Sequence, residues 1–184
     1  MEEWRRVLPN QLSTYLQHLE DTGSEVLFAR DSAGQAQLLY IARDIDDQRP
    51  VCWAGTTPSA KQGAGVSGAL PIEYLNFHTT IHDGFRQVSG LANGLVPLQE
   101  LTALSNYFDT SEAEFYKTGE NFDPESIDLS SAYGVFLNFD MSGYAVDTSN
   151  PDHPTAGWYW FENTLEPISD FWAGINDALL AETR

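Results

Sequence analysis

The sequence has a single cysteine, Cys52, and this excludes an internal disulfide bond. It has no apolar run that approaches the roughly 18 residues typical of a membrane-spanning helix. Its first ten residues lack the apolar segment of a secretory signal peptide. We therefore expect a cytoplasmic protein with no membrane as its partner, while export by a route that needs no signal peptide stays open.

Basic residues are also scarce. The chain has 9 Lys and Arg residues against 27 Asp and Glu residues, for a formal net charge of −18. The imbalance is largest from Leu98 onward, where 16 acidic residues accompany only Lys117 and Arg184. Such a surface repels nucleic acid and anionic membranes and attracts a basic partner. A solvated acidic surface that only favours solubility is the simpler alternative.

Core-forming residues are plentiful. Hydrophobic residues make up 42% and aromatic residues 12% of the 184 positions, so a packed core is expected. This length suits one well-buried domain and is short for two. We expect residues 1–184 to form a single domain, with an N-terminal helix and hairpin in residues 1–54.

Turn signals and periodicity predict the elements of the first half. Asn10 suits the N-cap of a helix that ends near Gly23, and Pro71 suits the first turn of a helix that ends at Asp83-Gly84. Strands are predicted at Val26–Arg30, Gln37–Arg43 and Val51–Trp53, a loop at Gly55–Ala69, and a further helix from Val96 with Leu98, Leu101 and Leu104 on one face.

A meander and a closing helix are predicted in the second half. Ser111 suits the N-cap of a short helix through Lys117, and Pro167 suits the first turn of the last helix. Strands are predicted at Tyr133–Asp140, Tyr144–Thr148 and Gly157–Glu162, and the last helix carries Ile168, Phe171, Trp172, Ile175 and Leu179 on one face. This order of elements predicts an α+β fold with an antiparallel, or mixed, sheet flanked by helices.

Short catalytic motifs occur without the context that their chemistry needs. Residues 63–68 match G-x-G-x-x-G, but no predicted strand precedes them and no helix follows directly. Asp21-Thr22-Gly23 matches the aspartic-protease tripeptide, but it follows a helix and has no second copy, so a helix C-terminus is predicted. Cys52 is expected to be a buried structural residue. We therefore expect no catalytic residue and no cofactor.

Two histidines have metal-ligand spacing. His78 and His82 lie four residues apart, so that a helix places both on one face, next to Asp83 as a third ligand. The segment HTTIH lacks the glutamate of the metalloprotease motif HExxH. We expect surface histidines with ordinary hydrogen bonds and no metal, with metal binding as the alternative.

Aromatic residues at Trp158–Phe161 occupy both faces of the predicted strand Gly157–Glu162. One face belongs to the core, and the other suits a protein or sugar platform. With a carboxylate pair drawn from the many acidic residues, Trp158 and Trp160 support an alternative function as a carboxylate-based hydrolase or a carbohydrate-binding protein.

A family resemblance rests on several short motifs: Leu70-Pro71, Tyr74 and Phe77, His82-Asp83-Gly84-Phe85, Gly94–Leu101, the turn Ser142-Gly143 and the closing helix with Phe171 and Trp172. Together they resemble the SUKH superfamily, which includes bacterial immunity proteins against polymorphic toxins and fungal regulators of cell-wall synthesis. The resemblance runs from Gly55 to the C-terminus. It implies a SUKH-like core in residues 55–184, without catalytic residues or cofactor.

The resemblance and the acidity together predict an immunity protein. It would bind a cognate toxin, such as a nuclease with a basic active-site face, and block it by occlusion without catalysis. A scaffold or regulatory role of the fungal kind is a further alternative. The expected toxin-binding residues are Glu112, Glu114, Tyr116, Glu120, Phe122, Asp123, Glu125 and Asp128.

Overall fold

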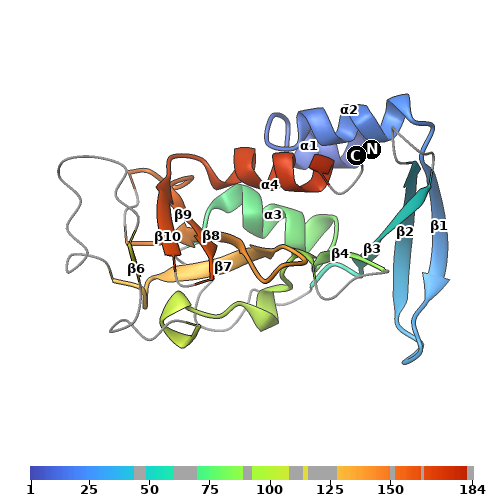
Figure 1. The fold of residues 1–184 in the computed structure, drawn as a ribbon. Coiled ribbons are helices and arrows are strands. Elements are labelled where there is room, and N and C mark those ends of the chain that lie inside the picture. Colours follow the sequence, from blue (N-terminus) through green and yellow to red (C-terminus); the bar gives the residue numbers. More distant parts are fainter. Residues whose placement is uncertain are drawn as a thin grey trace.

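A computed structural model describes residues 1–43, 49–59, 70–88, 93–107, 114–115, 128–149, 152–162 and 164–181 (Figure 1). The α-helices of these residues are α1 (Glu2–Val7), α2 (Ser13–Asp21), α3 (Ile72–Thr80) and α4 (Phe171–Ala181). The strands are β1 (Glu25–Arg30), β2 (Ala36–Arg43), β3 (Pro50–Thr56), β4 (Phe85–Gln87), β5 (Gly94–Leu95), β6 (Glu114–Phe115), β7 (Ala132–Leu137), β8 (Gly143–Asp147), β9 (Gly157–Phe161) and β10 (Thr164–Ile168). None of the described helices is long and apolar enough to cross a membrane.

One sheet joins all these strands, in the order β1-β2-β3-β4-β5-β7-β8-β9-β10-β6. Every neighbouring pair is antiparallel except β6 with β10, which is parallel. The predicted α+β fold with a largely antiparallel sheet is therefore confirmed. The hairpin β1–β2, the third strand β3 and the meander β7–β8–β9 lie where apolar, aromatic and β-branched runs between turn residues predicted them.

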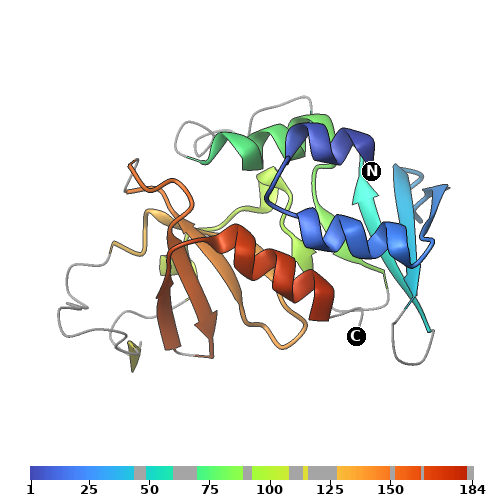
Figure 2. The same ribbon diagram turned by 90° about the horizontal axis from the view of Figure 1, so that it is seen from above.

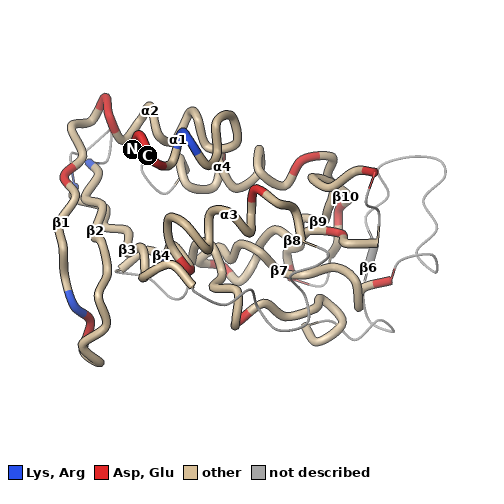
Figure 3. The backbone as a smooth tube through the Cα atoms, turned by 180° about the vertical axis from the view of Figure 1, so that it is seen from behind, with Lys and Arg blue, Asp and Glu red and all other residues tan. Residues whose placement is uncertain are grey.

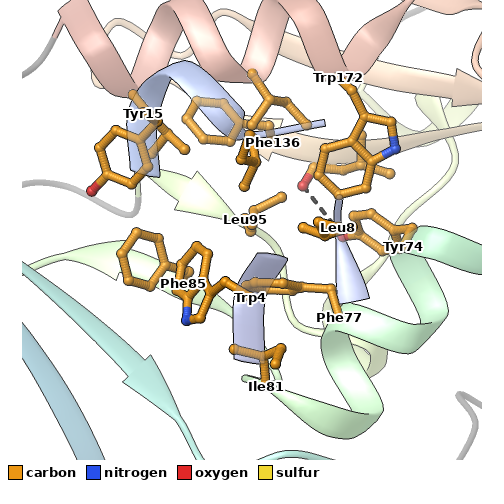
Figure 4. Packing of buried hydrophobic residues seen from close by; sticks show 14 of the residues in the cluster. Trp4, Leu8, Tyr15, Tyr74, Phe77, Ile81, Phe85, Leu95, Phe136 and Trp172 are labelled. Carbon is orange, nitrogen blue, oxygen red and sulfur yellow. Dashed lines mark hydrogen bonds between the residues drawn. The ribbon is translucent and has the colours of Figure 1, made fainter. Parts of the chain in front are cut away.

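The helices form a layer over one face of the sheet, and the segment with the 3₁₀ turns Leu98–Glu100 and Leu104–Asn106 lies beneath β7 (Figures 1 and 2). The main core lies between helices and sheet (Figure 4). Apolar side chains three and four residues apart put Tyr15, Leu16 and Leu19 on the buried face of α2. A second cluster, which includes Leu104, Trp158 and Trp160, fills the other face of the meander.

Helix α1, which was not predicted, contributes the central aromatic residue of the core. Trp4 is buried, and its ring meets those of Tyr40, Phe77 and Phe85 edge-on at centroid distances of 5.5, 5.1 and 5.0 Å. Edge-to-face contact matches the positive edge of one ring with the negative face of another. Trp4 therefore joins α1 to strands β2 and β4 and to helix α3 in a single packed cluster.

Several predicted helix boundaries are wrong. Leu12, not Asn10, is the N-cap of α2, and Pro167 lies inside β10 opposite Trp158 instead of opening α4. The helix predicted from Val96 is replaced by two short 3₁₀ turns, because Val96 hydrogen-bonds to the sheet at the carbonyl of Val135. The short helix predicted from Ser111 through Lys117 is wrong at Glu114 and Phe115, which form strand β6, and the rest of its range lies outside the described residues.

Close packing of β8 against β9 requires a glycine at residue 157. A β-carbon there would lie 1.9 Å from the carbonyl oxygen of Ala145. We expect Gly157→Ala to lower the free energy of unfolding by about 1–3 kcal/mol, because backbone atoms cannot rotate away as a side chain can. Urea unfolding measures the change.

Gly134→Ala is the matched control, since the nearest atom to a β-carbon at residue 134 is the Trp160 ring at 3.3 Å. This contact needs only a small shift of a side chain, so a clearly smaller loss of stability is expected. Equal losses in the two variants would contradict the assignment of Gly157 to close strand packing.

Candidate functional site

The structure describes only part of the predicted toxin-binding surface. The backbone of Glu114 lies in β6, beside Thr164 of β10. Asp128 is exposed just before β7, and its Oδ1 accepts hydrogen bonds from the N–H and Oγ of Ser130 at 2.9 and 2.5 Å. These bonds lower the pKa of Asp128. The other predicted contacts, Glu112, Tyr116, Glu120, Phe122, Asp123 and Glu125, lie outside the described residues, so this surface stays a prediction.

Trp158 and Trp160 are not available as a sugar platform. Both are buried in the cluster between the meander and Leu104. The indole Nε1 of Trp160 donates to the carbonyl of Met141 at 2.9 Å, which anchors the β7–β8 turn. The prediction that one face of this strand belongs to the core is confirmed for these two residues.

His78 and His82 are buried, so the prediction of surface histidines is wrong. His78 is 0% exposed and lies on α3, where its Nδ1 is 3.2 Å from Oδ1 of Asp83. The same Oδ1 accepts the backbone N–H of Leu98 at 2.9 Å. Asp83 thus connects the end of α3 to the following 3₁₀ turn. Within the described ranges, no group of three His, Cys, Asp or Glu side chains is placed to hold a metal ion.

His82 belongs to a different hydrogen-bonded chain. Its Nδ1 lies 3.1 Å from the carbonyl oxygen of Thr56, and its Nε2 lies 2.7 Å from the hydroxyl oxygen of Tyr40. The same hydroxyl oxygen lies 3.2 Å from the indole Nε1 of Trp4. A carbonyl only accepts and an indole N–H only donates. The proton of neutral His82 therefore resides on Nδ1, and the Tyr40 hydroxyl accepts from Trp4 and donates to Nε2.

Both imidazoles are held neutral at neutral pH. Burial lowers the pKa of His82 to about 4 despite its hydrogen bond to Thr56. Burial also lowers the pKa of His78, against the opposing effect of Asp83. Burial would raise the pKa of Asp83, but hydrogen bonds from His78, Leu98 and Ser59 hold it below its ordinary value. We conclude that Asp83 is an anion and that its Oδ1 accepts a hydrogen bond from the N–H at Nδ1 of neutral His78.

A cavity of about 260 Å³ opens beside the His82 ring. Its walls are mostly apolar and include Phe28 of β1, Leu38 of β2, Pro58 and Ile81. The ring of His82 takes the place of a side chain at residue 55, where an added β-carbon would meet it at 2.4 Å. The geometry suits one apolar group of a ligand, and none of the described lining residues is Asp, Glu, Lys or Arg.

Strand β1 carries three consecutive exposed apolar residues. Val26 and Leu27 are each 46% exposed and Phe28 is 66% exposed. Sequence reasoning assigned this hairpin correctly and missed its exposure. The sequence carries no signal for this exposure, because a continuous apolar run such as Val26–Ala29 is typical of a strand that is buried on both faces. Exposed apolar residues gathered on one strand are typical of an interaction surface.

The other motifs have structural roles. Asp21 ends α2, and Gly23 follows with φ of +64°, which confirms the predicted helix C-terminus. Cys52, which was predicted to be buried, is only half-buried in β3, and this partial burial raises the pKa of its thiol and so disfavours the reactive thiolate. Residues 63–68, with the glycine-rich motif, lie outside the described residues.

Comparison of the chain with protein-family models, with curated proteins and with solved structures gave no match.

Proposed function

We propose that this chain is an immunity protein of the SUKH type, which binds a basic toxin and blocks it by occlusion. The observation that carries the proposal is the net charge of −18. Acidic residues occur along the whole length of the described sheet and its helices (Figure 3). Arg5, Arg6 and Arg86 are already in ion pairs with carboxylates of the same chain, so they do little to offset this charge for an incoming partner.

The buried polar groups support binding without catalysis. Histidine is the side chain best suited to proton transfer near neutral pH, and His78 and His82 are two of the four histidines in the chain. His82 is joined to Tyr40 and Thr56, and His78 to Asp83, inside the packed core. Their hydrogen bonds hold α1, β2, β3 and α3 together, which is a structural use of these residues.

A basic toxin would be attracted to this surface before contact. Complementary charge raises association rates up to about 10⁸–10⁹ M⁻¹s⁻¹, and the gain falls as salt screens the charges. A nuclease displays Lys and Arg side chains to hold phosphates, so an acidic protein that covers them also excludes the substrate.

The test is capture followed by neutralisation. The full chain, immobilised, is incubated with extract of the cells that make it, and the retained protein is identified by mass spectrometry. A basic protein should be retained at low salt. Expressed alone it should arrest growth of a host, and co-expression of this chain should restore growth. Retained proteins that leave growth unaffected would refute the immunity function.

Charge reversal tests the predicted contact surface. We expect Asp123→Lys, Glu125→Lys and Asp128→Lys together to slow association with the captured toxin by about tenfold or more at low salt, since surface charges act mainly on the association rate. Stopped-flow or surface plasmon resonance measures the rate. The control, Glu2→Lys, Asp21→Lys and Asp152→Lys, changes the net charge equally at exposed sites elsewhere. Equal slowing by both triples would assign the effect to total charge and remove this surface.

A further inference from the structure

Strand β1 is the end strand of the sheet, and its outer edge has no strand partner among the described residues. The N–H of Asp31 donates to the carbonyl of Gln35, across the hairpin. Since the direction of N–H and C=O groups alternates along a strand, those of Ala29 and Leu27 also point to β2. The N–H and C=O groups of Val26, Phe28 and Arg30 therefore point away from β2, to the free edge.

The alternation is confirmed from the next strand. Ala36 lies opposite Arg30, and its carbonyl accepts a hydrogen bond from the Thr57 hydroxyl, on the side of β3. Even-numbered residues of β2 thus bond toward β3, and odd-numbered residues bond toward β1. The free edge of β1 offers a regular row of donors and acceptors, which is the template for an added strand.

The side chains along this edge favour an apolar contact on one face. Phe28 lies opposite Leu38, and Leu38 lies opposite Gly55, so the three share a face of the sheet. The cavity beside His82 opens on this face, with Phe28 as its wall nearest the edge of the sheet. A strand added along β1 would place every second side chain on the same face, next to Val26 and Phe28.

Strand β1 lacks three sequence features that commonly protect edge strands from pairing with another chain. It contains neither lysine nor proline, and no inward-pointing charge interrupts Val26–Ala29. Its one basic residue, Arg30, lies 5.7 Å over the Phe28 ring and donates to the carbonyl of Gly34. Arg30 therefore covers part of the exposed ring and leaves the backbone edge free.

Charge decides between possible occupants. Glu25 begins the strand and Asp31 follows it, in a chain of net charge −18. A second copy of the chain would bring two strongly negative molecules together, which like-charge repulsion opposes. A segment with basic side chains is attracted instead, and a Lys on the face of Leu27 can reach the carboxylate of Glu25.

We propose that β1 accepts an extended, basic segment of a partner protein as an additional strand, with an apolar side chain of that segment against Phe28 at the mouth of the cavity. The inference rests on the proposed function for the assignment of this strand to a basic protein partner. The partner then docks at the free edge of β1, separate from the predicted surface at residues 112–128.

A peptide tests the edge directly. The probe is the acetylated and amidated peptide KVKFKVK, whose valine and phenylalanine side chains share one face, and the control is EVEFEVE. Hydrogen exchange of the amides is measured by NMR. KVKFKVK should slow exchange at Val26, Phe28 and Arg30 by about tenfold or more and leave Leu27 and Ala29, already bonded to β2, little changed. EVEFEVE should have no effect.

A proline substitution removes one outward N–H. Val26→Pro keeps a small apolar side chain, and an edge strand tolerates proline where the N–H faces away from its neighbour. We expect it to weaken KVKFKVK binding about tenfold, the cost of one lost strand hydrogen bond, with the same thermal midpoint as the control Val26→Thr. Val26→Thr retains the N–H and should bind nearly as the wild type does.

Several results would overturn the inference. These are no binding of KVKFKVK, equal binding of EVEFEVE, binding that leaves the edge amides unchanged, and protection of those amides that rises with protein concentration without peptide, which would indicate a second copy. Its failure is distinguishable from failure of the proposed function. A toxin that binds Val26→Pro as tightly as the wild type refutes the edge strand alone, whereas the absence of any toxin partner refutes the immunity function.

Discussion

Trp4→Ala is expected to lower the free energy of unfolding by about 3–5 kcal/mol, the usual cost of deleting a large buried aromatic side chain. Trp4 is almost fully buried, contacts Tyr40, Phe77 and Phe85 edge-on, and donates its indole N–H to the Tyr40 hydroxyl. The cavity left behind would lie among side chains from α3, β2 and β4, which can relax only partly. Urea unfolding followed by circular dichroism measures the loss.

Trp4→Phe is the matched control. It keeps an aromatic ring in the same place and removes the indole N–H, so Tyr40 loses one donor. We expect this variant to lose about 1–3 kcal/mol, clearly less than Trp4→Ala, because most of the apolar contact remains. A loss below about 1 kcal/mol for Trp4→Ala would show that helix α1 is not part of the cooperative core.

Acidification from pH 6.5 to pH 4 is expected to destabilise the protein through His82. The pKa of His82 in the folded protein is about 4, below the ordinary value of 6.5, because burial disfavours the charged imidazolium. The unfolded chain therefore binds the proton first as the pH falls. The contribution of neutral His82 is complete above pH 6.5 and is lost as the pH falls toward 4, by about 3 kcal/mol in all.

His82→Gln isolates this contribution. Glutamine does not titrate and can still accept from the Tyr40 hydroxyl, so the variant should be less stable than wild type at pH 7 but should lose less stability on acidification. The carboxylates, Asp83 among them, and His78 titrate in both proteins, so the difference between the two curves removes their separate effects and keeps the titration of His82 with its repulsion by His78. Parallel curves between pH 6.5 and 4 would contradict the burial of a neutral His82.

The sequence determined the elements that a local pattern of apolar residues and turn residues specifies. The apolar runs on both sides of the turn Asp31–Gly34 define the β1–β2 hairpin, and the aromatic and β-branched run before Ser142-Gly143 defines β7 and β8. Tyr15, Leu16 and Leu19 define the buried face of α2. These patterns are local, because each depends only on neighbours a few residues away, and the α+β fold class follows from their order.

Tertiary structure alone decided the remaining features. Strands β4 and β5 have three and two residues, too few for a periodic signal, and they exist because β3 and β7 supply partners on both sides. Pro167 resembles a helix start, yet pairing with β9 holds it in β10. Local sequence does not specify which long-range partner a residue meets.

The candidate sites divide in the same way. The sequence determined the acidity of the surface, because charge is a property of composition. The histidine spacing suggested one shared face, but His78 bonds to the nearby Asp83, whereas His82 bonds to Tyr40, 42 residues away in the sequence. Likewise Val26, Leu27 and Phe28 resemble core residues in sequence, and only the place of β1 at the end of the sheet leaves them exposed. Burial depends on which elements cover a strand, and that is decided when the whole chain packs.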